Sequence, residues 1–96
     1  MLDQTVVDHM VAHNGVKYNL RKAAEEFQEL ALVLMQKTNK KDDFVDNQEI
    51  IDERGDVIIR LEVLKKLFPM DQINQRVADK MDKFRGYIET KKYSKF

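Results

Sequence analysis

The chain has no cysteine, one proline and three glycines among its 96 residues. The absence of cysteine excludes disulfides and thiolate metal sites. Helix breakers are scarce, and no run of alternating apolar and polar residues is long enough for a sheet, so the sequence predicts an all-α protein. No apolar run approaches the roughly 20 residues that a membrane-spanning helix needs. The first residues show no basic-then-apolar signal pattern, so we expect a soluble, cytoplasmic protein without a membrane partner.

An excess of charge of one sign is also missing. The 17 basic and 17 acidic residues cancel, so no overall field favours binding to a nucleic acid polymer. The balance is uneven along the chain: residues 1–56 hold 12 acids and 7 bases, and residues 76–96 hold 7 bases and 3 acids. An acidic centre with a basic C-terminal part suits a metal ion and the anion that accompanies it, although ordinary charge pairing between helices explains the same pattern.

Helical periodicity predicts the architecture. The length indicates one domain, residues 1–96, and so small a core favours self-association. We expect a four-helix bundle-like fold that is completed by oligomerisation, with a flexible tail at about 90–96. The expected helices cover about 3–13, 16–37, 47–68 and 71–89.

Local signals mark the ends of these helices. Asn14-Gly15 should end the first helix. Asp46 and Glu49 have the spacing of a capping box at the start of the third helix. Asp71 is the expected N-cap of the fourth helix.

Two acidic motifs stand on separate predicted helices, Glu25-Glu26-x-x-Glu29 and Glu53-x-x-Asp56. Within each motif, acids three or four positions apart share one helix face. Two such faces brought together form an all-oxygen cage. Mg²⁺ prefers oxygen ligands of this kind, and it is commonly bound together with substrate phosphates. The motifs therefore indicate metal-assisted phosphate chemistry.

The first motif is ambiguous when it is taken alone. An apolar stripe at helical spacing predicts the buried face of the second helix, and the three glutamates should fall on the other side. A solvated acidic face would have the same pattern. The residues of this stripe are Leu20, Ala24, Phe27, Ala31 and Leu34.

The second motif favours a metal. The stripe of the third helix contains Ile50, Val57, Leu61, Leu64 and Phe68. Glu53 lies close to the axis of this stripe and Asp56 at its edge. An unpaired carboxylate in a packed seam is costly, so Glu53 needs a metal ion or an ion pair with an arginine such as Arg60 or Arg76. We favour the metal, because several clustered carboxylates repel one another when no cation is present.

The chemistry needs no nucleophilic side chain. A carboxylate-lined magnesium site binds a polyphosphate and lowers the pKa of a bound water. Phosphoryl transfer depends mostly on positioning and charge stabilisation, and a glutamate that is not fully engaged with the metal could orient the attacking water. The fourth helix offers basic residues for the phosphates: Arg76, Lys80, Lys83 and Arg85.

The two acidic motifs, in this order, resemble those of the MazG-like all-α nucleoside triphosphate pyrophosphohydrolases. The pattern of that family is EExxE, a variable spacer, then ExxD. Here 24 positions separate Glu29 from Glu53, and the resemblance covers about residues 16–87. The resemblance implies Mg²⁺-dependent hydrolysis of a (deoxy)nucleoside triphosphate to the monophosphate and pyrophosphate by a metal-activated water, in a homo-dimer or homo-tetramer, with Mn²⁺ as a substitute ion.

The resemblance also implies roles for individual residues. The metal ligands would be Glu26, Glu29, Glu53 and Asp56. Glu25, together with Glu26, would be catalytic, as a further ligand or as a water-orienting residue. The residues implied for phosphate binding are Lys22, Lys80, Lys83 and Arg85. Phe84 stands where family members often have an asparagine, and no tryptophan is present for the base.

Two other functions remain open from the sequence. One is the related phosphoribosyl-ATP pyrophosphohydrolase, which is similarly short, all-helical and built on acidic motifs. The other is a non-catalytic helical module for partner binding, in which the acids form a solvated face.

Overall fold

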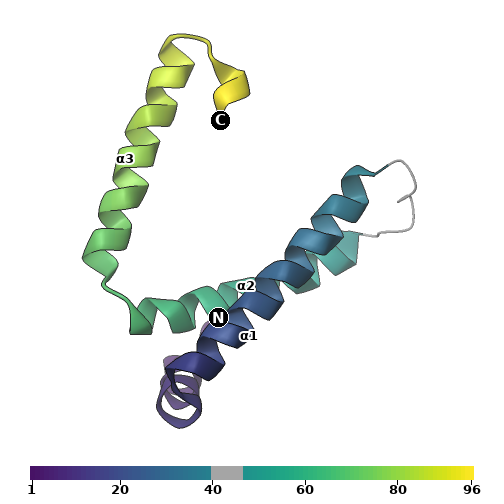
Figure 1. Cartoon of the computed structure of the whole chain (residues 1–96), viewed down its shortest axis with the longest axis vertical. Coiled ribbons are helices and arrows are strands. Elements are labelled where there is room, and N and C mark those ends of the chain that lie inside the picture. The colour runs from purple at the N-terminus through teal and green to yellow at the C-terminus, as the bar shows by residue number, and fades with distance from the viewer. Residues whose placement is uncertain (40–46) are drawn as a thin grey trace.

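The computed structural model describes residues 1–39 and 47–96. Its helices are α1 (Gln4–Thr38), α2 (Asn47–Leu67), α3 (Met70–Glu89) and the short 3₁₀ helix η1 (Tyr93–Lys95). The described residues contain no strand, which confirms the all-α class. Helices α1 and α2 lie side by side, whereas α3 rises away from the end of α2 (Figure 1). No helix in the described ranges is long and apolar enough to cross a membrane.

Helix α1 contains a break at Gly15. Asp3 caps its start, because the Asp3 carboxylate accepts hydrogen bonds from the backbone N–H groups of Thr5 (3.0 Å) and Val6 (3.3 Å). At Gly15 the backbone adopts φ 78° and ψ 172°, a region that is essentially restricted to glycine. The two helices expected on either side of Asn14-Gly15 are therefore two helical segments of α1, which are separated by a break at the predicted glycine.

Asn19 holds this bend in place. Its side chain is fully buried, and its Nδ2 donates to the backbone carbonyls of Gly15 (2.8 Å) and Met10 (3.1 Å). One amide thus satisfies the carbonyl of the break residue and a carbonyl of the preceding segment, where the regular helical hydrogen bonds are interrupted.

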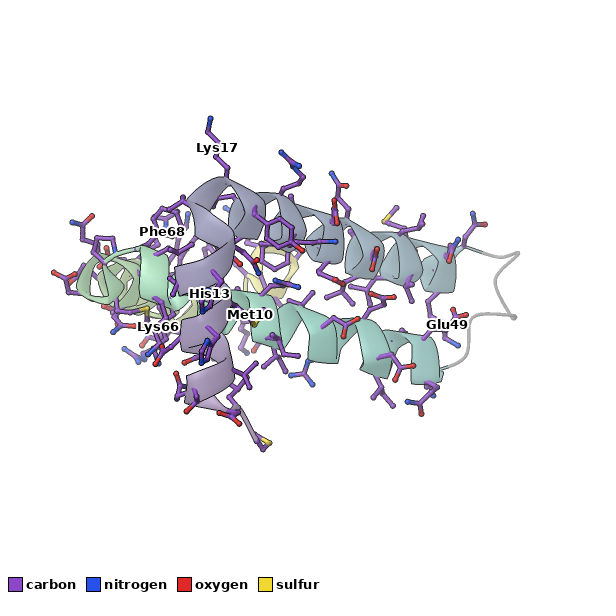
Figure 2. The ribbon with its side chains drawn as sticks, turned by 90° about the horizontal axis from the view of Figure 1, so that it is seen from below. Met10, His13, Lys17, Glu49, Lys66 and Phe68 are labelled. Atoms are coloured by element: carbon purple, nitrogen blue, oxygen red, sulfur yellow. The ribbon has the colours of Figure 1, made fainter. Side chains whose placement is uncertain are left out.

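The bent N-terminal segment of α1 crosses α2 (Figure 2). Gln4 donates a hydrogen bond to Glu62 (3.0 Å), and Lys66 forms an ion pair with Asp8 (3.8 Å). These contacts and the bend make α1 and α2 one packed unit.

The face of α1 that packs on α2 differs from the expected one. Among the described residues, the buried apolar side chains are Val7, Ala23 and Val63. Glu26, one turn from Ala23, is half-buried toward α2, whereas Leu20 and Leu34 of the predicted stripe remain 41% and 44% exposed. The prediction that Glu26 points away from the packed face was therefore wrong. Apolar residues occur on two sides of this helix, and the position of α2 decides which side is covered.

The apolar face of helix α3 is largely uncovered within one chain. Val77 and Met81 of its stripe are 55% and 48% exposed, so the described residues of a single chain do not form a closed four-helix bundle. The N-cap of α3 is Pro69, not the expected Asp71, which lies in the first turn. The fixed φ of proline, here −66°, suits a helix start, and the N-cap lies two residues before the expected aspartate.

The C-terminal residues turn back onto α3. The ring of Phe96 packs edge-on against Phe84 with centroids 5.7 Å apart, and it lies 6.2 Å from the ring of Tyr87. Residues 90–96, expected as a flexible tail, thus have a defined contact with α3. Asp46, the expected capping residue of α2, lies outside the described residues.

Candidate metal centre

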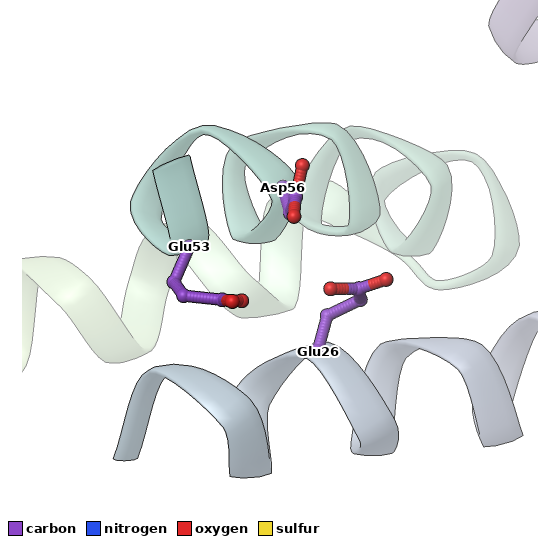
Figure 3. A group of neighbouring side chains, drawn as sticks. All are labelled: Glu26, Glu53 and Asp56. Carbon is purple, nitrogen blue, oxygen red and sulfur yellow. The ribbon is translucent and has the colours of Figure 1, made fainter. Parts of the chain in front are cut away.

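Three carboxylates from α1 and α2 converge in the seam between the two helices. One oxygen each from Glu26, Glu53 and Asp56 lies within 4.8 Å of the others. Figure 3 shows Glu26 rising from α1 toward Glu53 and Asp56 of α2. Glu26 and Glu53 are half-buried, and Asp56 is exposed. Among the residues that the structure describes, no other group of three potential metal-ligating side chains is this close.

Helical geometry explains the convergence. Glu53 and Asp56 are three residues apart on α2, so they share the face that looks toward α1. Ala23 is buried, so its side of α1 packs against α2. Glu26 follows Ala23 by about one helical turn and therefore lies on the same side of α1, opposite Glu53 and Asp56. Two acids on one helix and one on the other therefore form the cluster (Figure 3).

The cluster is electrostatically unfavourable without a cation. The Oε2 atoms of Glu26 and Glu53 are buried and have no hydrogen-bond partner. Burial raises the pKa of Glu26, and the neighbouring carboxylates of Glu29 and Asp56 raise it further. The positive charge of Arg60 lowers the pKa of Glu26. A divalent cation would satisfy the orphaned oxygens and remove the repulsion.

Glu29, the fourth expected ligand, lies beside this group rather than in it. Its carboxyl shares a hydrogen bond with Glu26, which contributes to the raised pKa of Glu26. Its side chain is exposed. Glu29 is therefore a neighbour of the triad through Glu26 and is not one of its three members.

The predicted catalytic Glu25 faces solvent. It forms an ion pair with Lys22 at 3.3 Å, and Lys22 also lies 5.9 Å from the centre of the Tyr18 ring. The structure thus brings a predicted catalytic acid and a predicted phosphate-binding base together, next to the triad in sequence and in contact with solvent.

The basic residues of α3 are not brought to the triad within one chain. Arg85 forms an exposed ion pair with Asp82 at 2.9 Å. The ammonium group of Lys80 lies 5.7 Å from the centre of the Phe84 ring, and Lys83 is exposed. All of them stand on the helix that extends away from α1 and α2 (Figure 1).

The alternative of a buried ion pair at Glu53 is not observed. Among the ion pairs of the described residues, none joins Glu53 to Arg60 or to Arg76. Arg60 is half-buried, and its Nη1 is buried without a hydrogen-bond partner. The sequence predicts Arg60 only as a salt-bridge partner. Its spacing of four from Asp56 and seven from Glu53, on one helix face, was the signal for a place in this site.

Comparison with protein-family models, with curated proteins and with solved structures finds no match to this chain.

Proposed function

We propose that this chain is a Mg²⁺-dependent nucleoside triphosphate pyrophosphohydrolase, which releases the monophosphate and pyrophosphate. The observation that carries the proposal is the convergence of Glu26, Glu53 and Asp56 within 4.8 Å, from two helices. The order and spacing of the two acidic motifs, with their resemblance to the MazG-like family, support the same reaction.

The residues fit a hard divalent cation. They offer only carboxylate oxygens, and two buried oxygens have no partner in the protein. Glu26, Glu53 and Asp56 would hold Mg²⁺, or Mn²⁺ in its place, with Glu29 adjacent. When bound, the ion supplies charge neutralisation at the phosphates and a lowered pKa for a water.

The remaining acids and bases are proposed to orient the reactants. Glu25 and Lys22 neutralise each other in the free protein. When Lys22 turns to a substrate phosphate, the Glu25 carboxylate is released and can accept a proton from the attacking water. The water adds to one phosphorus of the α–β phosphoanhydride, and the bond from this phosphorus to the bridging oxygen breaks.

We further propose that the active form is a homo-dimer or homo-tetramer. The chain exposes 7793 Å², whereas a folded monomer of 11.4 kDa exposes about 5,800 Å². Its radius of gyration is 16.8 Å, against about 12.5 Å for a compact domain of this length. An excess of about 2,000 Å² per chain is the scale of an obligate interface.

Assembly also offers a route for the basic residues of α3 to reach the triad. The apolar stripe of α3 and the stripe of Leu20 and Leu34 on α1 both remain exposed. Burial of such stripes against another copy is the dominant favourable term in association. We propose that Lys80, Lys83 and Arg85 act at the site of a neighbouring copy.

The decisive test is pyrophosphate release from a panel of ribo- and deoxynucleoside triphosphates, with and without Mg²⁺ or Mn²⁺. Metal-dependent release, with the monophosphate as co-product, supports the proposal. Release of orthophosphate contradicts it, because a different bond would be cleaved. Turnover of phosphoribosyl-ATP alone would assign the related activity. No turnover of any substrate would indicate a non-catalytic module.

A further inference from the structure

Arg60 is the basic residue that the structure brings to the acidic triad. It follows Asp56 by one helical turn on α2 and lies half-buried in the α1–α2 seam. Its charge acts on Glu26, which stands on the facing helix. Its spacing of four residues from Asp56 and seven from Glu53 puts Arg60 on the face of α2 that carries both acids, and its Nη1 atom is buried.

The guanidinium is near these acids without pairing to them. No ion pair of the described residues joins Arg60 to Glu26, Glu53 or Asp56, and its Nη1 is buried with no hydrogen-bond partner. A buried donor without a partner is costly. An arginine that served only to neutralise the acids would be expected to contact them, so this donor is poised for a group that the protein itself does not supply.

Two of the other basic residues considered for the site form ion pairs elsewhere. Lys22 pairs with Glu25, and Arg85 pairs with Asp82 on α3. A guanidinium presents a rigid fork of donors that matches two phosphate oxygens. Arg60 thus has the side-chain chemistry of an anion ligand. Its Nη1 donor is buried without a partner, and it lies on the same helix face as the proposed cation ligands Glu53 and Asp56.

We propose that Arg60 binds the phosphate oxygens of the metal-bound polyphosphate and is a substrate-binding residue of this site. This inference rests on the proposed function, because it assigns Arg60 a role at the same metal centre. It adds a phosphate ligand from α2 of the same chain, independent of the basic residues of α3.

Substitution of Arg60 should have different effects on the affinity for the cation and on the affinity for the anion. Arg60 repels Mg²⁺, so Arg60→Gln should leave the affinity for Mg²⁺ alone unchanged or raise it. The same substitution removes a phosphate ligand, so the affinity for pyrophosphate at saturating Mg²⁺ should fall at least about tenfold. A purely structural arginine would give a different result, because damage to the seam would weaken the binding of both ions.

The experiment is isothermal titration of the full chain, first with MgCl₂ alone and then with inorganic pyrophosphate at saturating Mg²⁺. Arg60→Gln is compared with Arg60→Lys, which keeps the charge but loses the fork and should bind pyrophosphate with intermediate affinity. Arg54→Gln, an exposed arginine on the same helix, is the matched control and should leave pyrophosphate binding unchanged. If Arg60→Gln does not fold, as judged by circular dichroism, Arg60→Lys carries the test.

The outcomes separate the two proposals. Unchanged pyrophosphate affinity in the folded variants, or equal loss of Mg²⁺ and pyrophosphate, overturns the role of Arg60. Absence of pyrophosphate binding by the wild-type chain overturns it as well. If the wild-type chain binds pyrophosphate through Arg60 but turns over no triphosphate, the anion site stands and the hydrolase proposal fails.

Discussion

Glu26 of α1 and Glu53 of α2 face each other across the helix seam, and each keeps one buried carboxylate oxygen without a hydrogen-bond partner. Their ligand atoms lie within 4.8 Å of one another and of Asp56. Carboxylates this close repel each other, so the folded chain carries an electrostatic cost that a cation would relieve.

The first prediction concerns Glu53. Glu53→Gln should abolish Mg²⁺-dependent turnover while the helical circular dichroism spectrum is retained, because one ligand is lost without a change of shape. In the wild-type chain, Mg²⁺ at 100 times its Kd should stabilise the fold by about 2.7 kcal/mol, and this increment should disappear in the variant. Glu89→Gln, exposed at the end of α3, removes the same charge and should keep both properties. Retained turnover in Glu53→Gln would show that the site is assigned wrongly.

The second prediction concerns pH. The pKa of Glu26 is raised in the folded chain by burial and by Glu29 and Asp56. Between the ordinary and the raised pKa, the folded chain keeps a proton that the unfolded chain has lost. The stabilisation from this group is therefore fully present below the ordinary pKa and is lost as pH rises through the raised one. In metal-free buffer, Glu26→Gln should reduce this fall in stability with pH in urea titrations. An identical pH profile in both proteins would contradict the raised pKa.

The third prediction concerns Asn19. Asn19→Ala should destabilise the fold by about 1–3 kcal/mol, because the backbone carbonyls of Met10 and Gly15 lose their donor in a buried place. Chemical denaturation measures the change. Asn74→Ala, at an exposed position on α3, is the control and should change stability by less than about 0.5 kcal/mol. Equal effects of the two substitutions would show that Asn19 does not hold the bend.

The fourth prediction concerns Gly15. Its φ of 78° with ψ of 172° is disfavoured for other residues, so Gly15→Ala should cost about 1–3 kcal/mol. Gly86→Ala is the matched control: it lies inside α3, and an added Cβ meets no atom within 4 Å. In a regular helix, alanine should stabilise by up to about 1 kcal/mol. Thermal melts of the two variants should therefore move in opposite directions, and a shift in the same direction would argue against the break at Gly15.

The fifth prediction concerns assembly. Sedimentation should give a mass of two or four times the 11.4 kDa of one chain. Met81→Glu places a charge in the exposed stripe of α3 and should shift the chain toward the monomer, because burial of an unpaired carboxylate is costly. Gln72→Glu adds the same charge on the other side of α3 and should leave the mass unchanged. A wild-type chain that sediments as a monomer would contradict the proposed assembly.

The sequence predicted the features that depend on local signals. The all-α class follows from helical periodicity, and the break follows from Asn14-Gly15, since glycine tolerates a backbone that other residues avoid. Helix α2 begins at the expected residue and ends one residue early. The N-cap of α3 was predicted at the wrong residue, because Asp71 and Pro69 are competing start signals.

Which acidic and basic side chains belong to the site depended on how α1 packs against α2. The stripe on α1 pointed to the wrong packing face, and only contact with α2 shows that Glu26 is turned inward. The same contact places Glu29 and Glu25 outside the triad and brings Arg60 beside it. Spacing on one helix cannot determine the rotation of that helix against another.

By itself, the amino-acid sequence determined which residues form helices, where α1 bends and which acids share a helix face, because these properties depend on neighbours within a few positions. The tertiary structure alone decided which of those faces meet. It joined Glu26 to Glu53 and Asp56, left the basic residues of α3 apart from them, and exposed apolar stripes on α1 and α3. Packing between distant segments is a property of the whole chain, and here one chain leaves much of its apolar surface uncovered.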